Sequence, residues 1–296
     1  MTQPRVKAIR ALVPVMGAAL AVAGCGSAAS KEGSSQSPSQ VIKRAAYVSS
    51  SAAGCRVAIN LQEGSTAIGG DVVGTGTGSF NLPKRAGKLT LNLNLPGSLS
   101  AAGTLSVQEI ISGQKLYVKL PSQVASKLPG AKPWIEIDLD QLGHAAGIQN
   151  LTSLFGGSGS TNPGQFLQYL RATSSGGVKK LGTGSVDGVQ ATHYRASLDL
   201  LRAPAAAPAA ARASLRQAVS NLEKLTGLRT IPVDVWVDSQ HLVRRVTMDY
   251  TLKVSGQSVR SQLRLDFLSY GPQPVPPVPS PGQVTSAGSL LSQLKG

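Results

Sequence analysis

Cys25 has the clearest chemistry in this sequence, because a thiol directly after small residues (Val-Ala-Gly, 22–24) fits the acylation site of a bacterial lipoprotein. An apolar stretch over residues 11–23 precedes it, and a basic segment comes first, with Arg5, Lys7 and Arg10. The apolar stretch is shorter than the roughly 20 residues of a transmembrane helix. We therefore expect residues 1–24 to be a cleaved signal peptide. Lipid on Cys25, such as palmitate, would anchor the chain to the outer face of the cytoplasmic membrane, in the cell envelope.

The other chemically capable residues lack the partners that an active site needs. His144, His193 and His241 lie in three separate segments without ligands at metal-binding spacing, so no metal site is expected. Residues 74–78 (Gly-Thr-Gly-Thr-Gly) resemble a dinucleotide loop, but Ser79 stands where that loop needs its third glycine. A strand pattern follows instead of a helix, which favours a strand with glycine kinks. Residues 112–115 match S-x-x-K, but that serine must begin a helix and here lies between strand patterns. We expect no enzyme activity and no cofactor.

Carboxylates and the second cysteine fit structural roles. Four carboxylates alternate with Ile or Val in two strand patterns, which predicts solvent-facing charges: Glu136, Asp138, Asp234 and Asp238. Cys55 stands alone once Cys25 is acylated, so no intramolecular disulfide is expected. The alternating run that follows it favours a buried thiol over a reactive one.

The charge of the chain is strongly basic but dispersed. Residues 1–24 hold three of the 29 basic residues and none of the 14 acidic ones, which leaves a net charge of +12. No run of basic residues is longer than two, and the doublets at 43–44, 84–85, 179–180 and 244–245 are scattered along the chain. We therefore expect no nucleic-acid partner, and the balance suits an anionic lipid surface. Only twelve aromatic residues are present, which argues against a base-stacking platform.

Two-residue alternation of apolar and polar side chains dominates the sequence. Residues 88–95 (Lys-Leu-Thr-Leu-Asn-Leu-Asn-Leu) are the clearest case, with leucines on one face. Further strands are expected at 56–63, 71–80, 104–111, 115–120, 134–139, 189–200, 232–238, 242–254 and 258–270. Helices are expected at 40–47, 121–128, 139–147, 163–172 and 205–225. Turn-rich residues between most strands favour consecutive antiparallel pairing.

These elements predict an α+β fold in which helices cover one face of a large curved antiparallel sheet. The 272 residues after the signal peptide suffice for one domain with its own core, and we expect a monomer. The expected organisation is a lipidated cysteine and flexible tether at 25–44, a single domain at 45–271 and a proline-rich C-terminal tail at 272–296.

Three segments together resemble the actinobacterial LppX/LprG-type (LppX_LprAFG) lipoproteins. They are 113–120 followed by 132–139, 232–238 followed by 242–246, and 265–271 running into the prolines. The likeness extends over about residues 55–282. That family is similar in architecture to LolA and LolB, in which a half-barrel sheet surrounds helices and an apolar cavity for acyl chains. This sequence departs from the pattern of that family at two places that bear on the cavity mouth. The turn 239–241 lacks the glycine usual there, and the Ala/Pro-rich segment 203–213 is expanded.

The resemblance implies a lipid-binding protein that takes acyl lipid or glycolipid from the membrane to the envelope or to a membrane transporter. The cavity residues expected on the half-barrel are Leu89, Leu91, Leu93, Val233, Val235, Val237, Met248, Leu263, Leu265 and Phe267. Each of them fits equally well as a core residue packed against the helices. Two alternatives remain open: a sensor or regulatory lipoprotein acting through protein–protein contacts, and a structural envelope lipoprotein without ligand.

Overall fold

Twelve strands form one open sheet within the described residues of this computed structural model. The structure describes residues 36–65, 69–97, 103–119, 121–125, 130–138, 163–173, 177–207, 209, 212–254 and 257–290. The signal peptide, Cys25 and the helix expected at 139–147 lie outside them. Residues 36–296 form a single unit with its own contacts.

The strands follow the chain in two meanders that meet at the centre of the sheet. They are β1 (Cys55–Ser65), β2 (Gly70–Asn81), β3 (Ala86–Asn94), β4 (Thr104–Ser112), β5 (Lys115–Lys119), β6 (Trp134–Asp138), β7 (Lys179–Val186), β8 (Val189–Asp199), β9 (Thr230–Asp238), β10 (Val243–Val254), β11 (Gln257–Tyr270) and β12 (Val284–Ser286). Their order is β12-β6-β5-β4-β3-β2-β1-β11-β10-β9-β8-β7. Every pair is antiparallel except β12 with β6. The expected α+β class and large antiparallel sheet are confirmed.

Strands with alternating apolar and polar side chains were predicted from sequence, and the two strands without this alternation, β7 and β12, were missed. In β3, Leu89 and Leu91 are buried while Thr90 and Asn92 are exposed, as a strand with one dry face requires. Strand β7 forms an edge, is mostly exposed and contains two glycines, so its sequence carries no alternating apolar signal. Strand β12 has only three residues and pairs with β6 after the proline-rich segment has returned to the sheet.

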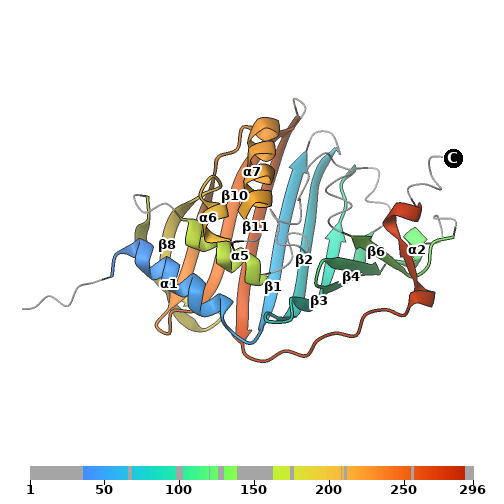
Figure 1. Ribbon diagram of the computed structural model, residues 1–296, viewed down its shortest axis with the longest axis horizontal. Coiled ribbons are helices and arrows are strands. Elements are labelled where there is room, and N and C mark those ends of the chain that lie inside the picture. Colours follow the sequence, from blue (N-terminus) through green and yellow to red (C-terminus); the bar gives the residue numbers. More distant parts are fainter. Residues whose placement is uncertain are drawn as a thin grey trace, which may run out of the picture. The chain divides into compact units, whose positions relative to one another are not determined.

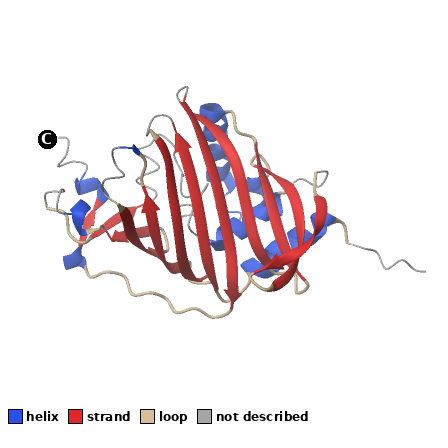
Figure 2. Cartoon of the chain, turned by 180° about the vertical axis from the view of Figure 1, so that it is seen from behind, coloured by secondary structure: helices blue, strands red, loops and turns tan. Residues whose placement is uncertain are grey.

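Helices cover one face of the sheet, and the other face carries none of the described helices (Figures 1 and 2). They are α1 (Pro38–Ser50), α2 (Ser122–Ala125), α5 (Pro163–Tyr169), η4 (Leu170–Ala172), α6 (Ala203–Ala206), α7 (Arg212–Thr226) and η6 (Pro281–Gln283). In Figure 1, α1, α5, α6 and α7 lie in front of the strands from β8 to β1. We call the covered side the inner face and the opposite side the outer face. None of the described helices is both long enough and apolar enough to cross a bilayer.

Two predicted boundaries are wrong for local reasons. The tether expected to reach residue 44 is too long, because α1 begins at Pro38 and buries Ile42 completely. Ser37 caps this helix by a reciprocal pair of hydrogen bonds with Gln40. The helix expected at 205–225 is divided into α6 and α7. Ala207 is extended, as the residue before a proline tends to be, and it ends α6.

Candidate apolar binding site

An apolar cavity of about 190 Å³ lies between the inner face and the helices. Its walls come from β1, β3 and β8–β11 on one side and from α5 and α7 on the other. The lining residues are Ile59, Leu61, Glu63, Leu91, Pro163, Phe166, Tyr169, Leu198, Leu200, Leu222, Ile231, Met248, Tyr250, Ser261, Gln262, Leu263 and Leu265. Most of these side chains have no group that hydrogen-bonds, so the cavity suits an apolar occupant.

Strand register brings the floor of the cavity together. Leu61 pairs with Leu263, which pairs on its other side with Met248, so one apolar row crosses β1, β11 and β10. Ile59 and Leu265 form the next row. Successive residues of a strand point to opposite faces, and the polar residues between these ones therefore lie on the outer face.

Glycines on the inner face of β2 leave room for the leucines of its neighbours. A Cβ on Gly74 would lie 2.8 Å from both Leu61 Cγ and Leu93 Cδ2. A Cβ on Gly76 would lie 2.4 Å from the carbonyl oxygen of Thr90 and 2.6 Å from Leu91 Cδ2. The Gly-Thr-Gly-Thr-Gly sequence is thus a strand, as expected, and its glycines let leucines of β1 and β3 lean over β2.

A polar row closes one end of the lining. Glu63, Ser261 and Tyr250 are cross-strand neighbours on β1, β11 and β10. Ser261 is buried, and its hydroxyl lies 3.4 Å from Glu63 Oε1, whereas Glu63 itself is exposed. The cavity therefore has apolar walls and one polar end that reaches solvent.

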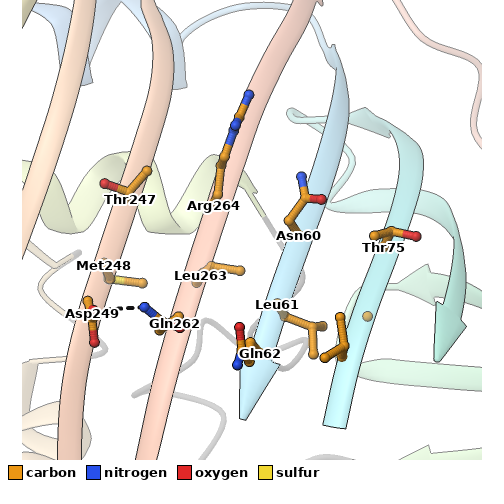
Figure 3. Close-up of a pocket in the computed structure, with 12 residues that line it drawn as sticks. Asn60, Leu61, Gln62, Thr75, Thr247, Met248, Asp249, Gln262, Leu263 and Arg264 are labelled. Carbon is orange, nitrogen blue, oxygen red and sulfur yellow. Dashed lines mark hydrogen bonds between the residues drawn. The ribbon is translucent and has the colours of Figure 1, made fainter. Parts of the chain in front are cut away.

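The outer face opposite the cavity is polar. A hollow of about 500 Å³ lies on this face, across β10, β11, β1 and β2. Figure 3 shows the residues that line it. Asn60 lines it, and Gln262 donates a hydrogen bond of 2.8 Å to Asp249. Leu61 and Leu263 border the same hollow and also line the apolar cavity behind it. The strands therefore separate a polar surface from an apolar interior.

The structure places the ten residues of the expected cavity in two groups. Four of them line the cavity: Leu91, Met248, Leu263 and Leu265. The other six belong to the packed core or its border instead: Leu89, Leu93, Val233, Val235, Val237 and Phe267. Helix α1 contacts β9, so a helix packs on the strand that carries the three valines.

Several lining residues were not expected from sequence. Phe166 was placed on a helix by its spacing, but its position over the sheet depends on where α5 packs. Leu198, Leu200 and Ile231 lie in strand patterns, with no local signal that distinguishes a cavity wall from a core.

The two adjacent arginines of β10 are engaged in ion pairs and do not line the cavity. Arg244 donates a hydrogen bond of 2.7 Å to Asp238, and Arg245 donates to Asp266. Asp238 was expected to be a surface charge, but it is 6% exposed. Its Oδ1 accepts hydrogen bonds from two backbone N–H groups of the β9–β10 turn, which explains its burial. In that turn His241 adopts a φ of 60°, a conformation that usually favours glycine.

Burial raises the pKa of both Cys55 and Glu109. Cys55 is a free, buried cysteine, as expected, and burial raises the pKa of its thiol to about 12. Glu109 lies on the inner face of β4 between Leu89 and Val118, and burial raises the pKa of its carboxyl to about 7. His, Cys, Asp and Glu side chains form no group able to hold a metal ion among the described residues.

Comparisons with known proteins give one partial sequence match and several structural likenesses. No family model matches the chain. A curated Streptomyces griseus protein, described as an uncharacterized 31.2 kDa protein in the rplA-rplJ intergenic region, is 32% identical over 167 residues. The match covers 50% of this chain and 47% of that protein, so the chain spans about half the length of the curated relative it matches.

Two solved structures of mycobacterial proteins each cover 81% of this chain at 12% identity. LprF from Mycobacterium bovis matches with a TM-score of 0.41 over 96% of its own chain. The lipoprotein LppX from Mycobacterium tuberculosis matches with a TM-score of 0.44 over 98% of its chain. Both are of the type that the three sequence segments resemble.

Proposed function

We propose that this protein is a lipoprotein, anchored through Cys25 at the outer face of the cytoplasmic membrane, that binds acyl lipid or lipoglycan in its apolar cavity. It would carry that lipid to the cell envelope or hand it to a partner such as a membrane transporter. The observation that supports this proposal is the cavity between the inner face and α5 and α7, with apolar walls and one polar end.

The two ends of the cavity suit the two parts of a lipid. An acyl chain would lie against Leu61, Leu265 and Phe166, and the headgroup would face Glu63 and Tyr250 at the polar end. Transfer from water contributes about 0.8 kcal/mol per buried CH₂, or about 12 kcal/mol for a chain of about 16 carbons. A bilayer provides a similar gain, so the cavity need only match the membrane for exchange to be near balance.

The size of the cavity requires a change of shape on binding. Its volume of about 190 Å³ is smaller than the roughly 300–1,000 Å³ of typical ligand pockets. Helices α5 and α7 form the wall that faces the sheet, and they share no ladder hydrogen bonds with it. We therefore propose that these helices move away from the sheet when lipid enters.

Native mass spectrometry with organic extraction tests this proposal. The chain from Gly26 onward, which keeps every described element, would be expressed in an actinobacterium. We expect one bound lipid per chain. Leu222→Trp, which fills the cavity from α7, should lose most of that lipid, whereas Leu181→Trp on the exposed edge strand should keep it. A wild-type chain without lipid that also takes up no added acyl lipid would contradict the proposal.

A second candidate function is a regulatory lipoprotein that binds another envelope protein. The extended segment 272–280 favours it, because Val275 and Val278 are each about half exposed there. A stoichiometric protein partner, together with an empty cavity in the same experiment, would support this candidate instead.

A further inference from the structure

A basic hollow of about 610 Å³ lies on the helical side of the unit, apart from the apolar cavity. Its lining residues are Lys43, Arg44, Tyr47, Arg171, Thr173, Arg202 and Ala205. Four of these seven carry a positive charge and none is acidic. They come from α1, from the end of η4 and from the start of α6, three segments distant in sequence that Figure 1 shows on the same side of the sheet.

Three of the four cations of this hollow, Lys43, Arg44 and Arg171, have no ion-pair partner within the described residues. On the outer face, Arg195 pairs with Asp234 at 2.8 Å, and Arg260 pairs with Asp249 at 2.6 Å. In the hollow only Arg202 has such a partner within the described residues, Asp199 at 3.3 Å. The hollow therefore keeps a net positive charge that attracts an anionic partner.

Apolar side chains and a buried hydroxyl accompany these charges. Tyr47 is 61% exposed in the hollow, and Leu201, next to Arg202 in sequence, is 51% exposed. Thr173 is only 2% exposed, and its hydroxyl has no hydrogen-bond partner among the described residues. Basic side chains beside an exposed tyrosine and leucine are the composition of a surface that binds the membrane interface.

We propose that this basic hollow docks on the surface of an anionic phospholipid bilayer. Lysine and arginine side chains would face the headgroup phosphates, and Tyr47 and Leu201 would enter the interface. Cys25 lies 13 residues before Pro38, and a fully extended chain of that length reaches at most about 47 Å. An anchor on Cys25 would thus hold α1, which carries three of the lining residues, near the membrane.

Docking would also bring the wall of the apolar cavity close to the bilayer. Helix α5 continues directly into η4, which carries Arg171, and α5 lines the cavity through Phe166 and Tyr169. The docking itself does not depend on lipid in the cavity. Its failure and the failure of the proposed function are therefore distinguishable.

Vesicle flotation of the unlipidated chain from Gly26 onward tests the docking surface. We expect binding to vesicles with phosphatidylglycerol, little binding to pure phosphatidylcholine, and a decrease as salt is added. Each basic side chain near an anionic surface contributes roughly a fivefold gain in partitioning, at about 1 kcal/mol. The double variant Lys43→Gln/Arg44→Gln should therefore bind about 30-fold more weakly.

Matched variants separate a local surface from overall charge. Lys84→Gln/Lys88→Gln removes the same charge from the β2–β3 turn and the outer face and should bind like the wild type. Arg171→Gln should weaken binding without altering α1. Equal loss in both double variants would overturn the proposal, because attraction would then follow net charge alone. Calorimetric binding of free inorganic phosphate that also abolishes vesicle binding would overturn it in favour of a small-anion site. Bound lipid measured by mass spectrometry should be unchanged in all these variants.

Discussion

Glu109 makes the stability of this protein depend on pH near neutrality. It lies on the inner face of β4 as the cross-strand neighbour of Leu89 and Val118, and its Oε2 has no hydrogen-bond partner among the described residues. Burial raises the pKa of this carboxyl from 4.5 to about 7, because a charge is poorly solvated there. The folded protein therefore keeps the proton to a higher pH than the unfolded chain does.

The sign and size of the effect follow from proton linkage. Below pH 4.5 both states are protonated and the full stability is present. As pH rises toward about 7, the unfolded chain releases its proton first and is favoured. At 1.36 kcal/mol per pKa unit, the difference between 4.5 and about 7 corresponds to a loss of about 3 kcal/mol in the free energy of unfolding.

Urea denaturation from pH 4.5 to 8 measures this loss. Glu109→Gln and Glu109→Leu have no titrating group at this position. Both should therefore lack the decline of about 3 kcal/mol in the free energy of unfolding that the wild type shows. Near pH 8 both variants should be more stable than the wild type. If the two variants keep the wild-type dependence on pH, the decline belongs to other groups and the argument from burial is refuted.

Three further predictions concern packing and charge elsewhere. Gly76→Ala should lower the free energy of unfolding by about 1–3 kcal/mol in urea, because its Cβ meets the Thr90 carbonyl, whereas Gly184→Ala, with nothing within 4 Å, should change it little. Burial raises the pKa of Asp266, but hydrogen bonds from Arg245 and Arg264 outweigh it and hold that pKa low. Asp266→Asn should therefore lower the free energy of unfolding, measured by thermal unfolding, by about 3 kcal/mol. The exposed control Asp249→Asn should lower it by less than about 1 kcal/mol, and similar losses in the two variants would contradict the role of burial. Cys55 should react with a thiol reagent only in denaturant, and rapid labelling of the folded protein would show that it is accessible.

The strands and their faces were predictable because side-chain alternation is a local property. The period of two in β3 places Leu89 and Leu91 on one face without knowledge of any partner, and the structure buries both. Helix α5 was also predicted from a local pattern, because Phe166, Leu167 and Leu170 have the three- and four-residue spacing of one helix face. Strands β7 and β12 were missed because an exposed edge and a three-residue strand carry little apolar pattern.

The cavity and the basic hollow depend on contacts that no local pattern encodes. Leu91 lines the cavity while Leu89, two residues earlier on the same face, is packed in the core. The difference arises from where the helices lie over the sheet. Lys43, Arg171 and Arg202 are far apart in sequence and were part of a dispersed charge until α1, η4 and α6 packed together. The sequence by itself thus determined which face of each strand is apolar, since that depends only on neighbouring residues. The tertiary structure decided which apolar residues border empty space and which charges share a surface, since both require the packing of distant segments.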